Sequence, residues 1–277
     1  MDKKANDLKK RLLESDLGKR ANYSESYDPA QLFSVARDYT RDTFSYKDFF
    51  GYDVWNCYEL SWLNENNVPQ AAIMQIIVPS NSKYIVESKS LKLYLNSFNN
   101  IIFKNFDEIE KLVAKDLSEL LVADVSVKIY EIEEYPYFTR NSFEICIDKE
   151  DVKIENLSEP DSDLLEYLPE EAEEILYSNA LRSICPITNQ PDFATVTIDY
   201  EGNKICRKSL LKYIASFRKH GGFHEKCVEK IHHDITRMCE QKRLLVYANY
   251  TRRGGIDICP YRADYSFTLD YKRAIRQ

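Results

Sequence analysis

Two ten-residue segments of the chain repeat one another, 119 residues apart. The first, KSLKLYLNSF, spans residues 89–98, and the second, KSLLKYIASF, spans residues 208–217; six of the ten positions are identical. Each segment is followed by a similar helix start, FDE at 106–108 and FHE at 223–225. Similar segments followed in the same order by similar elements indicate a duplication, so each half of the chain has to fold into the same small unit.

Hydrophobic periodicity predicts the same order of elements in each half. In the first half we predict strands at 54–63 and 70–79, helices at 89–98 and 106–121, and strands at 124–132 and 141–148. In the second half we predict strands at 193–200 and 202–206, helices at 208–218 and 223–239, and strands at 243–250 and 265–271. Two strands, two helices and two strands, twice over, indicate an α+β fold with antiparallel sheets and helices on one face.

An acidic segment separates the halves. Residues 148–174 hold twelve acidic residues and two lysines, a local charge of −10 in a chain of net charge −7. Such a run is typical of a solvated segment, and we interpret it as a linker with a short helix near its end. The predicted organisation is a first unit at 1–147, the linker at 148–174 and a second unit at 175–277. The remainder, at about +3, has no basic surface of the kind that nucleic acid requires.

Composition excludes several classes of protein. With 7 glycines in 277 residues, the chain contains neither a G-x-G-x-x-G fingerprint nor a G-x-x-x-x-G-K-[ST] loop. No apolar run approaches the roughly 18 residues that span a bilayer, and the first twenty residues have no apolar core or other mark of a targeting segment. The seven cysteines form no C-x-x-C pair. We therefore expect a cytoplasmic protein with reduced thiols and no membrane partner.

Cys185 and Asp192 stand out because a stiff, non-helical segment, SICPITNQPDF, presents both. A thiol at the junction of a loop and a strand is placed where functional groups concentrate, although most cysteines are inert buried thiols. A nucleophilic cysteine reacts as the thiolate. A neighbouring carboxylate disfavours that anion, so Asp192 suits a proton donor better than an activator.

Two further groups of residues could bind a ligand. His224 and Glu225 open a helix after a Gly-Gly break; they could hold an aromatic heterocycle, or they could simply be an acid that favours the helix dipole beside an exposed histidine. Four cations could grip phosphates, or could be ordinary surface charges: Lys89, Lys92, Arg252 and Arg253.

A zinc site is the other chemistry to weigh on the second of these helices. His224, Cys227, His232, His233 and Cys239 are close in sequence. Structural zinc sites normally take two short-spaced ligand pairs on turns, whereas these residues lie within one helix. We therefore predict that the chain holds no metal.

Four separated segments resemble, together and in order, the NADPH-dependent 7-cyano-7-deazaguanine reductases of queuosine biosynthesis: ESKSLKLYLNSFN, CPITNQPD, FHEKCVEKI and RRGGIDI. The chain is most similar to the long, duplicated form of that family. The resemblance implies two fused tunnelling-fold (T-fold) units, NADPH as co-substrate, no metal, and a homodimer in which the site forms between units. It also implies that the substrate is a deazapurine nitrile, reduced to an aminomethyl product.

The resemblance implies a role for individual residues. Cys185 is expected to add to the nitrile carbon and form a covalent thioimide, and Asp192 to protonate the nitrile nitrogen. The expected substrate contacts are Val86, Glu87, Ser88, His224 and Glu225, and the expected NADPH contacts are Ser88, Lys89, Arg253 and Gly254.

Two other functions are compatible with parts of the pattern. A zinc-dependent cyclohydrolase acting on a purine nucleotide would use a related fold, but it needs a metal-activated water. A non-catalytic nucleotide-binding protein would keep the pocket and lose the chemistry, so that Cys185 would react with alkylating agents no faster than Cys57 or Cys206. Similarity of fold alone does not separate these alternatives from the reductase.

Overall fold

A computed structural model describes residues 24, 26–41, 49–135, 144–155, 157–186, 188–271, 273–274 and 277. The chain divides into two units. Unit 1 comprises Met1–Asp42, Val54–Pro136 and Arg252–Asp257, and unit 2 comprises Thr43–Asp53, Tyr137–Thr251 and Ile258–Gln277. The first twenty residues, on which the expectation about targeting segments rests, lie outside the described part, as do residues 141–143 of one predicted strand.

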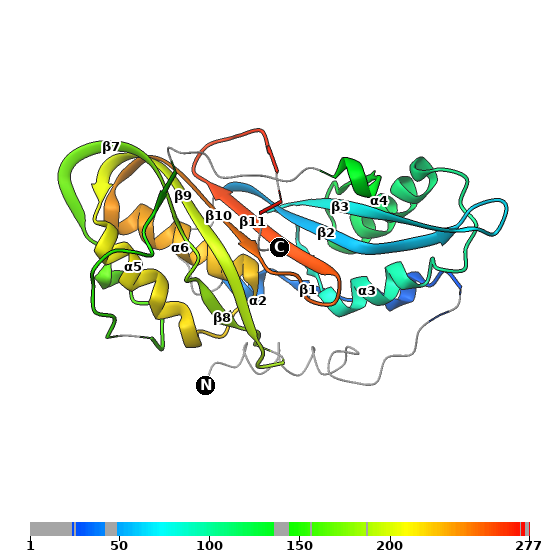
Figure 1. Cartoon of the computed structure of the whole chain (residues 1–277), viewed down its shortest axis with the longest axis horizontal. Coiled ribbons are helices and arrows are strands. Elements are labelled where there is room, and N and C mark those ends of the chain that lie inside the picture. Colours follow the sequence, from blue (N-terminus) through cyan, green and yellow to red (C-terminus); the bar gives the residue numbers. More distant parts are fainter. Residues whose placement is uncertain are drawn as a thin grey trace. The chain divides into compact units, whose positions relative to one another are not determined.

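The described part of unit 1 has three α-helices and a sheet in the order β5-β3-β2 (Figure 1). Strands β3 and β5 pair antiparallel, with Ile73 opposite Tyr130 and Ile77 opposite Ser126. A separate antiparallel pair joins β1 to β4. The elements are η1 (Pro29–Gln31), β1 (Ser34–Ala36), α2 (Asp38–Arg41), β2 (Phe50–Leu63, in this unit from Val54), β3 (Pro69–Pro79), β4 (Tyr84–Val86), α3 (Ser88–Asn96), α4 (Phe106–Leu121), β5 (Ser126–Tyr130) and η2 (Ile132–Glu134).

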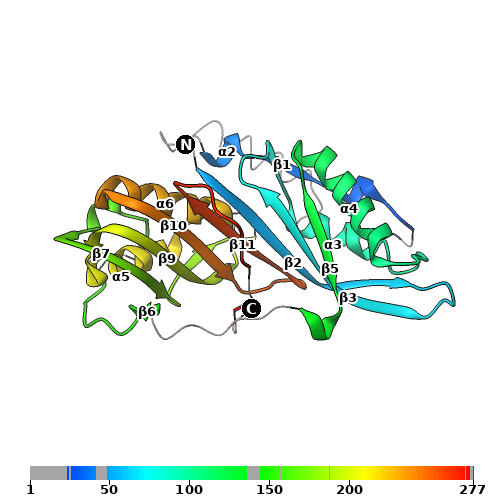
Figure 2. The ribbon, with the colours of Figure 1, turned by 90° about the horizontal axis from the view of Figure 1, so that it is seen from above.

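Unit 2 has a longer sheet in the order β11-β10-β9-β7-β6, and β8 also pairs with β9. Its pairs are antiparallel except β6–β7, which is parallel. Helices α5 and α6 run along one face of β9 and β10 (Figures 1 and 2). The elements are β6 (Glu144–Cys146), η3 (Ser162–Leu164), β7 (Tyr167–Ser178), β8 (Arg182–Ile184), β9 (Pro191–Ile205), α5 (Arg207–Ser216), η4 (Phe217–Lys219), α6 (His224–Cys239), β10 (Gln241–Tyr250) and β11 (Ile256–Ala263, in this unit from Ile258).

Helix α4 illustrates how the sequence sets these elements. Asn105 caps its N-terminus by accepting a hydrogen bond from the Glu108 backbone N–H, which satisfies an otherwise unpaired donor. Ile109, Val113 and Leu117 follow at four-residue spacing and are fully buried. The helix ends at Val122 in the left-handed conformation, with φ 53°. The prediction of a helix at 106–121 is confirmed, and so is the α+β class.

The repeated segments make equivalent contacts in both units. The Tyr94 hydroxyl donates to Asp116 Oδ2 at 2.6 Å, and the Tyr213 hydroxyl donates to Asp234 Oδ2 at 2.7 Å. The identical serines match as well: Ser97 and Ser216 each donate to the backbone oxygen three residues earlier, at 2.6 Å, and Ser90 and Ser209 do the same at 2.7 and 2.8 Å. Both tyrosines and the two phenylalanines that end the segments, Phe98 and Phe217, are fully buried. Five of the six identities, all except the lysine that opens each segment, are therefore core or hydrogen-bonding positions.

Three secondary-structure predictions were wrong. The end of the acidic segment forms strand β7 instead of a short helix. The glutamates of this strand face outward and pair with cations, as Glu171 does with Lys242 at 2.6 Å. The strands predicted at 193–200 and 202–206 are one continuous strand, β9. The last strand is Ile256–Ala263 and not 265–271. It contains Pro260 and is buried along its whole length, so it lacks the alternation that marks a half-exposed strand.

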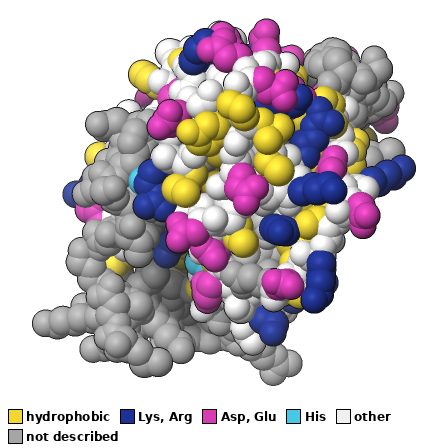
Figure 3. Space-filling model, turned by 90° about the vertical axis from the view of Figure 1, so that its left-hand side faces the viewer, with side chains coloured by type: hydrophobic (Ala, Val, Ile, Leu, Met, Phe, Trp, Pro, Cys, Tyr) yellow, Lys and Arg dark blue, Asp and Glu magenta, His cyan; other side chains and the backbone are white. Residues whose placement is uncertain are grey.

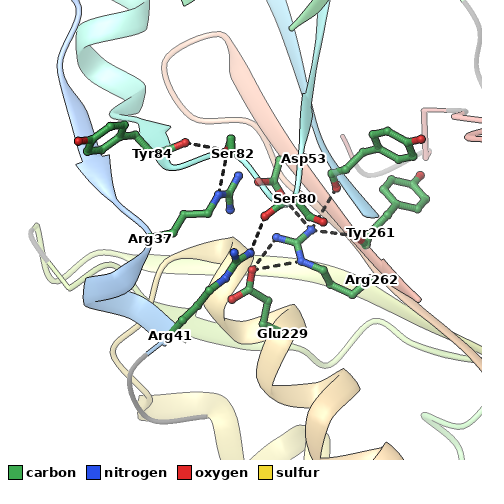
Figure 4. Close-up of polar contacts among 10 residues, drawn as sticks. Arg37, Arg41, Asp53, Ser80, Ser82, Tyr84, Glu229, Tyr261 and Arg262 are labelled. Carbon is green, nitrogen blue, oxygen red and sulfur yellow. Dashed lines mark hydrogen bonds and ion pairs between the residues drawn. The ribbon is translucent and has the colours of Figure 1, made fainter. Parts of the chain in front are cut away.

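A buried ion cluster fixes the middle of unit 2 (Figure 4). Arg262 on β11 is fully buried and lies 2.8 Å from both Asp53 Oδ1 and Glu229 Oε1. Its guanidinium also donates to the backbone oxygens of Tyr52 and Tyr261, at 3.2 and 2.8 Å. The cluster therefore ties β11 to helix α6 and to the start of β2 within this unit.

Buried arginine contacts also occur in unit 1, in the same view (Figure 4). Arg37 donates to the Ser82 hydroxyl at 2.9 Å, and Arg41 donates to the Ser80 backbone oxygen at 2.8 Å. Ser82 in turn donates to the backbone oxygen of Tyr84 at 2.8 Å. These bonds hold the turn before β4 against β1 and α2.

The surface seen from the side of β7 and α5 carries acidic and basic side chains intermingled, without a large basic area (Figure 3). Ion pairs account for part of this pattern: Lys204 pairs with Glu170 and Arg243 with Glu173, at 3.4 and 3.3 Å. Among the described residues, no helix is long and apolar enough to cross a membrane.

Candidate active site

Cys185 lies at the start of a tight connection between strands β8 and β9. Its backbone N–H donates to the Gln190 oxygen at 2.9 Å, and its own oxygen accepts from the Asn189 N–H at 3.0 Å. Asn189 adopts the left-handed conformation, with φ 56°, which asparagine tolerates better than most residues. Pro186 and Pro191 flank the connection, so the backbone that presents the thiol is closely constrained.

Cys185 and Asp192 project from the same face of this hairpin. Ser183 pairs with Asp192, and the bond from Cys185 to Gln190 continues that register. Residues opposite one another share a face, as do residues two apart on one strand. Cys185 is 8% exposed and Asp192 4%. The structure therefore brings the predicted nucleophile and the predicted acid together as diagonal neighbours in a nearly buried position.

Helix α6 begins beside this pair. His224 is its first residue, and its Nε2 lies 3.4 Å from Asp192 Oδ2. The loop before the helix is bound to the strand that precedes Cys185, since Ile184 donates to the His220 oxygen at 2.8 Å and accepts from the Gly222 N–H at 3.1 Å. Glu225 is buried in the first turn, where the helix dipole favours a carboxylate. Cys185, Asp192, His224 and Glu225 thus belong to one cluster in unit 2.

The His224 ring also stacks on Tyr250, which the sequence analysis missed. The ring centroids are 3.8 Å apart and the planes differ by 5°. Tyr250 is the last residue of β10 and pairs with Ala194, two residues after Asp192. No local pattern marks this contact, because Tyr250 and His224 lie 26 positions apart on different elements.

The second predicted group, Val86 to Lys89, lies in unit 1 where β4 meets helix α3. Glu87 is the N-cap of α3, and its carboxylate accepts from the backbone N–H groups of Lys89 and Ser90 at 2.9 and 2.8 Å. The Ser88 hydroxyl lies 3.4 Å from the same carboxylate. Glu87 is only 5% exposed, and the cap fixes its orientation by engaging both oxygens. An ionised carboxylate has about four acceptor sites, so Oε2, which accepts from Ser90 alone, can take a further donor.

The third group is the turn between β10 and β11, at Arg252 to Gly255. Arg253 and Ile256 close it with mutual backbone hydrogen bonds of 2.9 and 3.2 Å. Gly254 and Gly255 both have positive φ, 59° and 78°, as a tight hairpin turn requires. A Cβ at Gly255 would overlap Glu59 Cδ. The backbone conformation therefore favours glycine at both positions, and at Gly255 the space is restricted as well.

Helix α3 lies against this turn. A Cβ at Gly254 would be 3.4 Å from Lys92 Cδ, and Lys92 pairs with Glu59 at 2.9 Å. A cavity of about 20 Å³, roughly the size of one water, is lined by Cys57, Glu59, Lys92, Leu95, Asn96, Gly254, Gly255 and Ile256. Two of the predicted phosphate-binding elements, α3 and the turn, are thus neighbours in unit 1.

Side chains of the adjoining strands contact the turn. The Arg252 guanidinium lies over the Tyr58 ring, 3.9 Å from its centroid, a cation–π contact. The Tyr58 hydroxyl donates to Asp257 at 2.7 Å, and the Asn56 amide donates to the same carboxylate at 2.5 Å. Arg252 thus belongs to a turn against which Lys92 lies, and the two glycines leave its backbone open to close approach.

Three of the other thiols, Cys57, Cys227 and Cys239, are poorly suited to nucleophilic chemistry. All seven cysteines are free thiols. Burial raises the pKa of Cys227 to about 11 and that of Cys239 to about 12, and it raises the pKa of Cys57 as well. Within the described part of the chain, no group of three His, Cys, Asp or Glu side chains could hold a metal ion.

Comparisons with known proteins identify the family. A family model described as "Nitrile reductase, 7-cyano-7-deazaguanine-reductase N-term" matches residues 23–129, and one described as "QueF-like protein" matches residues 191–266. Three relatives carry the name NADPH-dependent 7-cyano-7-deazaguanine reductase. The relative from Desulfotalea psychrophila is 47% identical over 94% of this chain and 96% of its own length. Those from Acinetobacter baylyi and Paraburkholderia phymatum are 45% and 44% identical, each over 95% of this chain and 98% of the relative. The chain therefore belongs to the NADPH-dependent 7-cyano-7-deazaguanine reductase family.

Proposed function

We propose that this protein reduces the nitrile 7-cyano-7-deazaguanine to 7-aminomethyl-7-deazaguanine with NADPH, a step of queuosine biosynthesis. The observation that carries the proposal is the cluster of Cys185, Asp192 and His224 in unit 2, with a thiol and a carboxyl group on one hairpin face. A nitrile is a poor hydride acceptor, so a neighbouring nucleophile and acid are what its reduction needs.

The first step is covalent. The Cys185 thiolate forms a C–S bond to the nitrile carbon, one π bond of the C≡N group breaks, and the nitrogen takes a proton from Asp192. The product is a thioimide, with no atom lost from the substrate. Because Cys185 and Asp192 are diagonal neighbours on one face, the acid can reach the nitrogen of a nitrile whose carbon contacts the sulfur.

When bound, NADPH supplies the hydrides that convert the thioimide, over two rounds, to the amine. We propose that Ser88, Lys89, Arg253 and Gly254 contact it, joined by Lys92 and Arg252. The guanidinium groups and ammonium groups would bind its phosphates, and the glycine turn would let the backbone come close. The Cys185 sulfur leaves between the rounds, so the pocket must keep water from the free imine.

Substrate recognition falls to two sets of residues. Glu225 and His224 at the start of α6 would bind the deazaguanine in unit 2, and Val86, Glu87 and Ser88 would bind it from unit 1. A carboxylate such as that of Glu225 can accept paired N–H donors of a guanine-like edge. Glu87 would accept a donor with the side of its carboxylate that the helix cap leaves available.

Hydride transfer requires the two sets to act in one site. We propose that they meet in a homodimer. We also propose that each half, 1–147 and 175–277, is a T-fold unit with 148–174 between them. The matched tyrosine–aspartate and serine bonds of the two units support a duplication. Seven free thiols are in keeping with a cytoplasmic enzyme.

The experiment that tests the proposal is intact-mass measurement after mixing the protein with 7-cyano-7-deazaguanine and no NADPH. We expect one added substrate mass on the native protein and none on Cys185→Ala. Consumption of two NADPH per nitrile by the native enzyme would complete the test. A native protein that binds the nitrile and gains no mass would exclude Cys185 as the nucleophile and leave a binding protein.

A further inference from the structure

Tyr250 and His224 form the closest parallel pair of rings at the active site. The centroid distance of 3.8 Å and the interplanar angle of 5° describe full face-to-face contact. Most other ring pairs described in the chain are edge-to-face or tilted, and the stacked pair Tyr247–Tyr261 has centroids 4.8 Å apart. Two neutral rings do not favour a close parallel sandwich, so this contact needs a particular reason.

The position of the imidazole supplies a reason. Asp192 Oδ2 lies 3.4 Å from His224 Nε2, and the imidazole face lies against the Tyr250 ring. These two contacts together define the orientation of the imidazole, one through a ring nitrogen and the other through the ring face.

Tyr250 is itself held firmly. Its side chain is fully buried at the end of β10, and its backbone oxygen accepts from the Gln277 amide at 3.3 Å. The hydroxyl lies near Ser183 and the Cys227 thiol, and burial raises the pKa of Tyr250 well above its ordinary value. The ring is therefore a fixed, uncharged surface against which a histidine can be aligned.

Resting on the proposed function, we propose that Tyr250 is a positioning residue for His224. Its ring face fixes the imidazole plane so that Nε2 points at Asp192, and the aligned pair delivers protons to the substrate nitrogen. Without the stack, the imidazole is free to turn about its χ2 bond. A turned ring would break the 3.4 Å approach to Asp192, and misplacement of a catalytic group by about 1 Å can cost about 100-fold in rate.

The test compares Tyr250→Phe, which keeps the ring face, with Tyr250→Leu, which removes it. Tyr247→Leu is the matched control, because Tyr247 lies on the same strand and stacks on Tyr261 instead. The first readout is NMR of protein labelled at its 4 histidines, with His224 assigned through His224→Asn. The second is the rate of mass-adduct formation with saturating nitrile and no NADPH.

We expect upfield ring-current shifts of the His224 ring protons in the native protein, in Tyr250→Phe and in Tyr247→Leu, and their loss in Tyr250→Leu. We expect adduct formation about tenfold to a hundredfold slower in Tyr250→Leu, and within about threefold of native in the other two. If Tyr250→Leu does not fold, Tyr250→Met, which is flexible and lacks a ring, replaces it.

Unchanged His224 shifts in a folded Tyr250→Leu protein would overturn the proposal, and so would an adduct rate within twofold of native. A Tyr250→Phe protein as slow as Tyr250→Leu would also overturn it, by assigning the effect to the hydroxyl. The NMR readout needs no chemistry, so a native protein that forms no adduct would count against the proposed function while the shifts still test the stack.

Discussion

Replacing Arg262 by methionine should unfold unit 2 far more easily, because it leaves two carboxylates buried together without their cation. Asp53 and Glu229 lie 2.8 Å from the guanidinium, and all three side chains are almost completely buried. The methionine fills much of the volume of the arginine stem, so the substitution mainly removes charge and hydrogen bonds.

The magnitude follows from the geometry. Breaking a buried ion pair by removing one partner typically costs about 3–5 kcal/mol. Arg262 also donates to the backbone oxygens of Tyr52 and Tyr261, which would lose those bonds. We therefore expect Arg262→Met to lower the free energy of unfolding by about 4 kcal/mol at pH 7.5. The control is Arg243→Met, since Arg243 pairs with Glu173 and Asp199 at the surface and should cost under about 1 kcal/mol.

Urea unfolding followed by circular dichroism and by fluorescence would measure this difference. Both tryptophans, Trp55 and Trp62, belong to unit 1, so fluorescence reports that unit while circular dichroism reports both. The Arg262→Met transition should move to lower urea mainly in the circular dichroism signal if the units unfold separately, and in both signals if they unfold together.

The pH dependence of the stability difference distinguishes the loss of charge from the loss of packing in Arg262→Met. In Arg262→Met, burial and mutual repulsion favour the protonated carboxyls of Asp53 and Glu229, so folding takes up protons and acid stabilises the variant relative to the native protein. The gap between the two proteins should therefore narrow from pH 7.5 to pH 5.5. A gap below about 1 kcal/mol at pH 7.5, or one that stays constant with pH, would refute the reasoning.

Three other predictions follow from single contacts. Burial lowers the pKa of His232 to about 4 from 6.5, so its contribution to stability is complete above pH 6.5 and falls by about 2 kcal/mol at pH 5. The urea midpoint of His232→Gln should therefore change less between pH 7.5 and pH 5 than that of the native protein. An equal change in the two proteins would contradict this. Gly255→Ala should lower the melting temperature, because φ is 78° and the new Cβ meets Glu59; Gly254→Ala, with ordinary contacts, should lower the melting temperature less, and the reverse order would exclude the steric argument. Glu87→Ala should cost about 1 kcal/mol through the lost helix cap and raise the KM for the nitrile, whereas an altered melting temperature with unchanged KM would assign Glu87 to the cap alone.

The helices and the central strands could be predicted from sequence because local physics decides them. The stripe from Ile109 to Leu121 gave the bounds of α4, and the alternation in RLLVYANY gave most of β10. The hairpin at Cys185 could be placed as well, since two prolines and a turn residue restrict its backbone. The residues that determine each of these elements lie within about fifteen positions of one another in the sequence.

The remaining features depend on partners distant in sequence. Strand β7 is acidic and looks solvated, and it becomes a strand because Tyr167 to Ser178 pair with β9. Strand β11 is buried along its length and contains a proline, so its own pattern does not mark it. The stack of His224 on Tyr250 joins residues 26 positions apart on different elements, and no local pattern indicates it.

Comparison of the two halves separates structural from functional positions. Five of the six identities of the repeat are buried or hydrogen-bonded in the same way in both units, as with Tyr94 and Tyr213. The halves differ at the N-termini of their helices. Glu87 caps α3 with its side chain, whereas its counterpart before α5, Cys206, makes no side-chain cap bond. Asn105 caps α4, whereas α6 begins without a side-chain cap and places His224 beside Asp192. Loss of a helix cap costs only about 1 kcal/mol, so a duplicated fold tolerates that change. At a helix N-terminus, one of the two copies could therefore replace a stabilising cap with a binding or catalytic group.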